Sequence, residues 1–491
     1  MRNLSDIIRL PANNTIHARG YRTRLFPAPV CISFISAREC DGSMMKQWIE
    51  DNMDQQIEDL FGLLRIPSVS RGTPEPGMPL GRHVYHALEY AVDLAHRLGF
   101  DKTQILDGYC ATVDYGEGDE MLMLMAHLDV VPAGPGWDTD PFDPVIKDGR
   151  IYARGVFDDK SAAVSCLYAL AAVKNAGIPL NRRVRIFLGG DEEKLSACID
   201  RYKETEELPA LAFTPDASYP VVNSEMNILH ATYHLDLADS TVSISCGTAA
   251  NVVPGTAEAS LSFPAEPCPV PDGYSGEFSG NLIRINGLGG HAAMNDLARN
   301  ALQALMEVLS NQSLPESDLL IASGLHALLG YDLHGEGFGL DVRDESGALT
   351  LSPDILQWNS NGVTLTLDCR YPFCITCEEV LSKLDGALEV FGFRRGETHN
   401  SQGHYIPRDS ELVSTLLRIY EKHTGAPAEP ISMGGGTYAR GFENAVAFGI
   451  EYLDEPSECH MPNEKMAVSN ILFNTVIFAD AIAALGSGPK K

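Results

Sequence analysis

The sequence MLMLMAHLD (residues 121–129) decides the fold, because six apolar residues lead directly into His127 and Asp129. A short, continuous apolar run predicts a strand buried on both faces, as in a parallel sheet flanked by helices. In open α/β sheets, ligands bind just beyond the carboxyl ends of the strands. We therefore expect His127 and Asp129 to lie at a binding site.

Four other apolar segments precede potential metal ligands in the same way. IYARGVF leads into Asp158, VRIFLGG into the acidic triplet 191–193, ALAFTP into Asp216, and AVAFGIEYLDEPSEC into His460. Each segment alone is more often structural: a paired core histidine, a helix cap or a solvated acidic turn. Together they predict a mixed nitrogen and oxygen metal site, and this many carboxylates favours two ions that share a bridging carboxylate. A metal-dependent hydrolase is expected.

Composition limits the classes of partner. At 491 residues the chain is expected to form at least two domains. Its formal net charge of −29 argues against nucleic acid and anionic membranes as partners. The eleven cysteines show no repeated spacing, which indicates reduced thiols in a cytoplasmic protein. No apolar run was expected to approach the ~18 residues of a membrane span.

The pattern of elements predicts one domain split by another. Residues 1–43 are Arg-rich and acid-poor, and we expect a poorly ordered extension upstream of the real start at Met44 or Met45. Residues 44–225 alternate helix and strand, which predicts an α/β catalytic domain with a helix-flanked, mixed but largely parallel sheet. Residues 226–403 indicate an inserted, mostly antiparallel α+β lid domain. The catalytic domain resumes at 404–491. Helices are expected over 84–98, 160–176 and 295–309, with a further helix capped by Asp409 and ended by Gly425.

Six strings carry a resemblance to a known family. They are HLDVVPAG (127–134), WDTDPF (137–142), GRIYARGVFDDK (149–160), GDEE (190–193), PDA (215–217) and CHMPNE (459–464). In this order the chain resembles the aminoacylase/carboxypeptidase-like family of dinuclear zinc amidohydrolases. The PDASYPV segment and GGGTY (434–438) most resemble the dipeptidase V branch.

The resemblance implies a role for each matching residue of the metal site. His127 and Asp216 would bind one metal, Glu193 and His460 the other, and Asp158 would bridge both. Asp129 would hold His127 from behind, as carboxylates commonly do for metal-bound histidines. Glu192 would be the general base for a metal-bridging hydroxide, and would then protonate the leaving amine. The resemblance implies two divalent ions, Zn²⁺ first, with Mn²⁺ or Co²⁺ as alternatives.

The inserted domain would supply substrate contacts, again by resemblance. His291 in GLGGHAA would stabilise the oxyanion. Asn251 and Arg370 would contact substrate, and a guanidinium suits a free peptide carboxylate because it can bind both oxygens. The backbone of Gly434, Gly435 and Gly436 would lie against the substrate's C-terminal end. A phosphate loop is the competing interpretation of this triplet, but no Gly-Lys-Ser/Thr follows it.

These observations predict a monomeric, cytoplasmic dinuclear dipeptidase of peptide catabolism, acting on short peptides with a free C-terminus. An N-acyl amino acid deacylase or a carboxypeptidase could use the same site. A catalytically silent metal- or peptide-binding protein is the alternative from another class. The retention of Glu192 argues against it, because a binding protein has no need of a general base.

Overall fold

The computed structural model describes residues 37–70, 72–194, 196–452 and 457–488. They form two compact units: the first consists of the described residues within 1–221, 409–429 and 437–491, and the second of Val222–Arg408 and Pro430–Gly436. These boundaries fall near those expected, and the domain assignment stays a prediction. Of the expected extension, residues 1–36 lie outside the described part, and residues 37–43 belong to the helix that begins at Ala37.

The first unit contains the expected largely parallel sheet. Its strand order is β1-β2-β6-β3-β7-β24, in which β6, β3, β7 and β24 run parallel, and β1 and β2 add an antiparallel edge. The bounds are β1 (Lys102–Leu106), β2 (Cys110–Tyr115), β6 (Arg183–Gly189), β3 (Met121–His127), β7 (Leu211–Thr214) and β24 (Ala445–Ala447). Every residue of β3 is buried, as its continuous apolar run predicts. The predicted fold class is confirmed.

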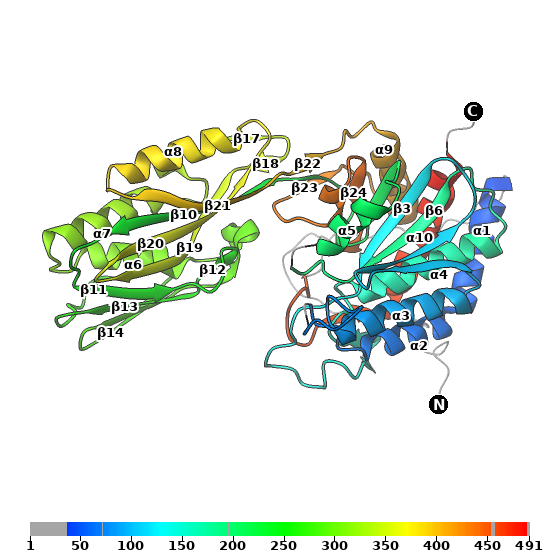
Figure 1. Cartoon of the computed structure of the whole chain (residues 1–491), viewed down its shortest axis with the longest axis horizontal. Coiled ribbons are helices and arrows are strands. Elements are labelled where there is room, and N and C mark those ends of the chain that lie inside the picture. Colours follow the sequence, from blue (N-terminus) through cyan, green and yellow to red (C-terminus); the bar gives the residue numbers. More distant parts are fainter. Residues whose placement is uncertain (1–36, 71, 195, 453–456, 489–491) are drawn as a thin grey trace, which may run out of the picture. The chain divides into compact units, whose positions relative to one another are not determined.

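Helices flank this sheet (Figure 1). They are α1 (Ala37–Asp51), α2 (Met53–Leu64), α3 (Arg82–Arg97), α4 (Lys160–Asn175), α5 (Ala197–Thr205), α9 (Glu411–Thr424) and α10 (Val468–Ser487). The small residues of α4 let it pack closely against α1, α2 and α10. Asp409 is not the cap of α9, because the Ser410 hydroxyl accepts the hydrogen bond from the Val413 N–H at 3.2 Å. Gly425 ends α9 with a φ of +70°, as expected.

Among the described residues, α10 is the one helix long and apolar enough to cross a membrane. The expectation that no segment approaches this length is therefore wrong by length and composition. Half of the apolar window is buried inside the protein, where α10 packs against α4 and α9. A buried core helix passes the same length test, so this feature is weak evidence for a membrane span.

An antiparallel sheet forms the centre of the second unit, as predicted. Its strand order is β14-β15-β13-β11-β19-β20-β10-β21. The bounds are β14 (Ser275–Ser279), β15 (Leu282–Asn286), β13 (Thr256–Leu261), β11 (Val242–Cys246), β19 (Thr350–Asn359), β20 (Gly362–Tyr371), β10 (Asn227–Asp236) and β21 (Arg394–Ser401). The helices α6 (Ala301–Ser310), α7 (Glu316–Leu329) and α8 (Cys377–Glu389) complete the α+β unit (Figure 1).

One expected helix of the second unit divides in two. The segment expected to be helical from residue 295 contains a 3-10 helix, η2 (Ala292–Leu297), and α6 begins only at Ala301. Asn300 caps α6, because its side chain accepts a hydrogen bond from the Leu302 N–H at 2.9 Å. This cap stops the helix from extending back towards His291.

Short elements complete both units. In the first unit they are β4 (Val145–Lys147), β5 (Arg150–Tyr152), β8 (Ala217–Ser218), β25 (Ile450–Glu451), β26 (Lys465–Ala467) and η4 (Tyr438–Gly441). In the second they are β9 (Val222–Glu225), β12 (Val252–Val253), β16 (Gly290–His291), β17 (Arg343–Asp344), β18 (Gly347–Ala348), β22 (His404–Tyr405), β23 (Ile431–Met433) and η3 (Glu336–Phe338).

The core of the second unit gives a stability prediction. Leu305 of α6 is fully buried, whereas Val390 is 79% exposed. We expect Leu305→Ala to lower the free energy of unfolding of this unit by about 2–5 kcal/mol. We expect Val390→Ala to change it by less than about 0.5 kcal/mol. Urea unfolding followed by Trp358 fluorescence, with Trp48 and Trp137 replaced by Phe, measures both; equal effects would contradict the assigned core.

Candidate metal centre

The six residues that the sequence singled out for metal and proton chemistry lie in the first unit, and close contacts join them. Three groups of ligand atoms each fit within 4.8 Å: Asp158 with Cys459 and His460; His127 with Glu192 and Asp216; His127 with Asp158 and Glu193. His127 and Asp158 belong to two groups each. The cluster is therefore continuous around them.

Three of the five segments reach the cluster as the strand-end argument predicts. β6, β3 and β7 are parallel neighbours, and His127 pairs with Gly189 in register. The loop after Gly189 carries Glu192 and Glu193, and Asp216 follows the end of β7. Because parallel strands end at the same edge of a sheet, these side chains meet there.

Asp158 reaches the cluster by another route, so the prediction that it follows a strand of the main sheet is wrong. The run before His460 does begin with β24 of the main sheet, although His460 itself lies well beyond the end of that strand. Of the run before Asp158, only Arg150–Tyr152 is a strand (β5), and it pairs with β4 and β26 in a separate small sheet. Asp158 lies in the turn before α4. His460 lies in a turn with a positive φ of 62° before β26. The pairing of β5 with β26 brings these two turns together.

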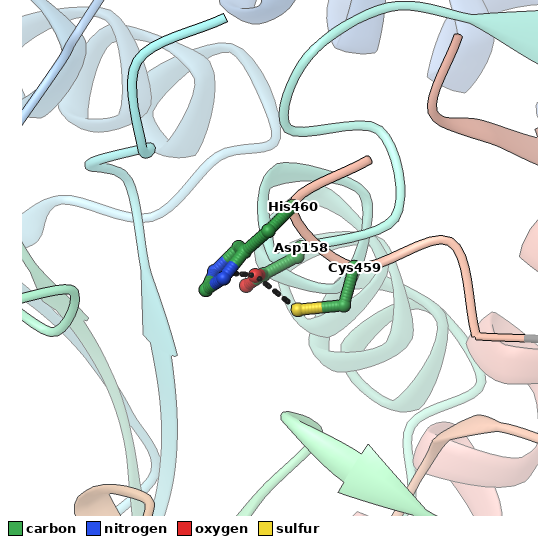
Figure 2. A group of neighbouring side chains, drawn as sticks. All are labelled: Asp158, Cys459 and His460. Carbon is green, nitrogen blue, oxygen red and sulfur yellow. Dashed lines mark hydrogen bonds and ion pairs between the residues drawn. The ribbon is translucent and has the colours of Figure 1, made fainter. Parts of the chain in front are cut away.

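Asp158 is the central ligand of the cluster. Its Oδ1 lies 2.8 Å from His127 Nε2, and its Oδ2 lies 3.1 Å from His460 Nε2. The same His460 nitrogen lies 3.0 Å from Glu193 Oε2. Figure 2 shows Asp158 between His460 and the thiol of Cys459. One carboxylate thus serves both histidines, which is the arrangement required of a bridging ligand.

Asp129 positions both His127 and the loop that follows β6. His127 Nδ1 lies 2.9 Å from the Asp129 main-chain oxygen and 3.5 Å from its carboxylate, so the closer contact is to the backbone. The carboxylate itself accepts hydrogen bonds from the N–H groups of Glu192 and Glu193, at 3.0 and 3.2 Å. The Ser70 hydroxyl donates to it at 2.7 Å. Asp129 therefore fixes the backbone of the loop that carries the two glutamates.

A buried ion pair that sequence reasoning missed holds the two turns. Arg154 Nη1 lies 2.6 Å from Glu464 Oε2, and both side chains are at most 2% exposed. The Glu464 carboxylate accepts hydrogen bonds from the backbone N–H groups of Gly155, Phe157 and Asp158. Arg154 also donates to the His460 carbonyl at 3.3 Å. This pair joins the Asp158 turn to the His460 turn.

The sequence contained a signal for these missed residues. Arg154 and Glu464 stand inside two of the strings that carry the resemblance, GRIYARGVFDDK and CHMPNE. An arginine and a glutamate in motifs that each contain one ligand could have been paired. Ser70 stands in none of the six strings, and the bridge between Val69 and Val130, with its backbone hydrogen bonds, brings it to Asp129.

Burial strongly perturbs the acids of this site. Burial raises the pKa of Glu192 to about 8, and nearby carboxylates add to this effect. Burial and then Asp158 raise the pKa of Glu193, and burial raises the pKa of Asp216 well above its usual value. Burial lowers the pKa of His460, but its hydrogen bonds to Asp158 and Glu193 outweigh this and raise the pKa to about 10. The site therefore favours added positive charge.

The donor set fits divalent cations. It offers two imidazoles and several carboxylates, which are the ligands of zinc and related ions. Glu193 Oε1 is buried and has no hydrogen-bond partner among the described residues. A buried carboxylate oxygen without a partner is costly, and a bound cation would remove that cost.

The residues expected to contact substrate lie in the second unit. His291 pairs with Val252 in the short β12–β16 ladder, and its Nδ1 accepts a hydrogen bond from the Ala293 N–H at 3.1 Å. Asn251 precedes this ladder, and its carbonyl accepts a hydrogen bond from the Ala292 N–H at 2.9 Å. His291 and Asn251 are therefore neighbours on one hairpin-like segment, and their roles stay predictions.

Arg370 is buried, and its guanidinium already forms hydrogen bonds within the second unit. Its Nε and Nη2 donate to the two carboxylate oxygens of Asp368, at 2.8 and 2.7 Å. Its Nη1 donates to the Gly434 carbonyl at 2.8 Å. The guanidinium therefore ties the segment of Gly434, Gly435 and Gly436 to the sheet of the second unit. Its bidentate face is occupied by Asp368, which sequence reasoning did not foresee.

Comparison with known proteins identifies relatives along nearly the whole chain. A model of Peptidase family M20/M25/M40 matches residues 123–484. A Bacillus subtilis (strain 168) protein named "Putative dipeptidase YtjP" is 34% identical over 451 residues, which cover 87% of this chain and 96% of that protein. A "Putative dipeptidase" of Staphylococcus epidermidis is 30% identical over 468 residues, 90% of this chain and 99% of that protein.

Solved structures share the fold. The dipeptidase Dug1p of Saccharomyces cerevisiae matches with a TM-score of 0.57 at 15% identity, over 91% of this chain and 99% of that one. Human carnosine dipeptidase 1 matches with a TM-score of 0.53 at 15% identity, over the same shares of the two chains. At this identity the likeness concerns the fold alone.

The buried ion pair gives a prediction for metal affinity. Arg154→Met should leave Glu464 as an unpaired buried carboxylate and loosen both turns, lowering stability by about 3–5 kcal/mol. Metal affinity should fall about 10- to 100-fold, as for other groups that support ligands. Arg201, whose side chain is 34% exposed and paired with Asp107 and Glu204, is the control, and Arg201→Met should change neither quantity. Isothermal titration with Zn²⁺ measures affinity; wild-type affinity in Arg154→Met would contradict the assigned support.

Proposed function

The chain belongs to Peptidase family M20/M25/M40 and is a metallopeptidase, and we propose that its substrates are dipeptides with a free C-terminus. The observation that carries the mechanism is the single carboxylate of Asp158 between His127 and His460. The dipeptide assignment is supported by the names of the relatives that align along almost their whole length.

In this proposal the cluster would hold two divalent ions. His127 and Asp216 would hold one ion, Glu193 and His460 would hold the other, and Asp158 would be shared by both. Zn²⁺ is the proposed ion, with Mn²⁺ and Co²⁺ as alternatives, because imidazole and carboxylate suit all three. When bound, such ions make water acidic and polarise the carbonyl oxygen of the substrate.

Glu192 is the proposed general base. Its neighbour Glu193 contacts His460, whereas Glu192 lies in a group with His127 and Asp216. Asp129 holds its backbone N–H, so the side chain starts from a fixed point. Glu192 takes the proton of the attacking water and passes it to the leaving amine nitrogen.

The second unit supplies the proposed substrate contacts. His291 is assigned to the charge that develops on the carbonyl oxygen, as a hydrogen-bond donor that acts most strongly in the transition state. Arg370, with Asn251 and the backbone of Gly434, Gly435 and Gly436, is assigned to the free carboxylate of the substrate. Because Asp368 occupies its bidentate face, Arg370 would act through its remaining Nη1 and through the glycine segment it holds. We also propose that the protein is a monomer and that it is cytoplasmic, and the nine free cysteines among the described residues support the second of these proposals.

A substrate panel tests the proposed activity. The metal-loaded enzyme should cleave Ala-Ala with a higher kcat/KM than Ala-Ala-Ala, N-acetyl-alanine or Ala-Ala amide. The amide lacks the charged carboxylate and should therefore lose binding energy, by about tenfold or more in kcat/KM. Faster cleavage of N-acetyl-alanine would favour a deacylase, and equal rates on dipeptide and amide would contradict recognition of the carboxylate.

Substitutions of two neighbouring glutamates test proton transfer and metal binding separately. Glu192→Gln should keep the metal content of the wild type and lower kcat by about 10²- to 10⁴-fold, because only the proton acceptor is lost. Glu193→Gln should instead lower the metal content, because it alters the assigned ligand of the ion at His460. Elemental analysis after gel filtration, with kcat for Ala-Ala, distinguishes the two. Metal loss in Glu192→Gln would remove that residue from the role of base.

A further inference from the structure

A thiol lies within the metal cluster and is used by no step above. Cys459 Sγ is 3.1 Å from Asp158 Oδ2, the oxygen that also lies 3.1 Å from His460 Nε2 (Figure 2). The ligand atoms of these three side chains all lie within 4.8 Å of one another. Among the described cysteines, Cys459 is the one that belongs to such a group.

A simple structural role could explain this contact. The thiol could serve only as a hydrogen-bond donor that orients the Asp158 carboxylate. A thiol is a weak donor, however, and the two Asp158 oxygens already have imidazole partners. Orientation alone therefore gains little from the sulfur.

The distances suit a shared ion. Bonds of about 2.3 Å to sulfur and about 2.1 Å to nitrogen or oxygen place two donors of a tetrahedral ion about 3.5 Å apart. The sulfur-to-oxygen and nitrogen-to-oxygen separations here are both 3.1 Å. The donors therefore need to separate by only a few tenths of an ångström to admit an ion.

Glu193 gives independent evidence for a cation beside His460. Its side chain is 6% exposed, and its Oε2 lies 3.0 Å from His460 Nε2. Its other oxygen, Oε1, is buried with no hydrogen-bond partner among the described residues. A buried carboxylate with one oxygen unsatisfied indicates a place for positive charge beside His460, the residue that shares Asp158 Oδ2 with the thiol.

We propose that Cys459 is a sulfur ligand of the ion held by His460, Glu193 and Asp158. On binding, the thiol loses its proton to solvent and the sulfur forms a bond to the ion. A sulfur donor shifts this position towards softer ions such as Zn²⁺, Co²⁺ and Cd²⁺, and away from Mn²⁺. The inference rests on the proposed metal assignment and is independent of the dipeptide substrate.

The test is the absorption spectrum of the Co²⁺-loaded full chain. The wild type should show a near-ultraviolet thiolate-to-cobalt charge-transfer band together with the visible ligand-field bands. Cys459→Ser should lose the charge-transfer band and keep the visible bands, because serine preserves a donor for Asp158 but offers no sulfur. Cys374→Ser, which removes an exposed thiol of the second unit, should leave both bands unchanged.

Two results would contradict the sulfur ligand, and only one of them would also contradict the proposed function. Visible bands without a charge-transfer band in the wild type would overturn the sulfur ligand and leave the proposed function intact. Failure of the wild type to bind Co²⁺ at all would overturn both.

Metal competition gives a second readout. Cys459→Ser should weaken Cd²⁺ binding by about tenfold or more. It should weaken Mn²⁺ binding by less than about threefold, because Mn²⁺ prefers oxygen donors. Titration calorimetry of both ions against wild type, Cys459→Ser and Cys374→Ser measures the ratio. An equal loss for Cd²⁺ and Mn²⁺ would show that Cys459 only orients Asp158, and would overturn the proposal.

Discussion

The structure of the first unit depends on the confinement of several acids at one edge of a sheet with two imidazoles between them. Two like charges 4 Å apart repel by about 4 kcal/mol at the effective dielectric constant near a protein surface. Burial is the main cause of the raised pKa values of Glu192, Glu193 and Asp216, and the repulsion from neighbouring carboxylates adds to it. Divalent cations offset the same cost. Metal binding is therefore the means by which this set of residues becomes electrostatically stable.

The surrounding fold holds the acids in place against that repulsion. Arg154 and Glu464 join the two turns that carry Asp158 and His460. Buried ion pairs add little stability over an apolar pair, but breaking one is costly, so they suit the fixing of geometry. Lys160 at the start of α4 is fully buried and donates to the carbonyls of Leu63, in the last turn of α2, and of Ile66, just after that helix. Burial lowers the pKa of Lys160 to about 7.

Local sequence patterns were sufficient for the parts of the site that follow the main sheet. The apolar run before His127 and those before the acidic triplet and Asp216 predicted parallel neighbours whose ends meet, and β6, β3 and β7 have this order. Asp158 reaches the cluster in a way that the strand argument did not predict, because β5 belongs to a separate small sheet, whereas the run before His460 does contain β24 of the main sheet.

What the sequence could not predict depends on contacts between distant residues. Ser70 donates to Asp129 across 59 positions, and Arg154 meets Glu464 across 310. No local period or cap carries that information. The same holds for Arg370: its residue type suggested a free carboxylate anchor, whereas its neighbour Asp368 occupies the bidentate face. The cap of α9 was predicted one residue too early. Ser410 caps the helix and Asp409 does not, because the Ser410 hydroxyl is the group that accepts a hydrogen bond from the Val413 N–H.

The central claim is that Asp158 bridges two ions held by the first unit. Anomalous diffraction from crystals of the Zn²⁺-loaded protein tests it most directly. The account predicts two peaks about 3.5–4 Å apart, one on each side of the Asp158 carboxylate, the first beside His127 and the second beside His460. A single peak, or two peaks that do not share Asp158, would contradict it.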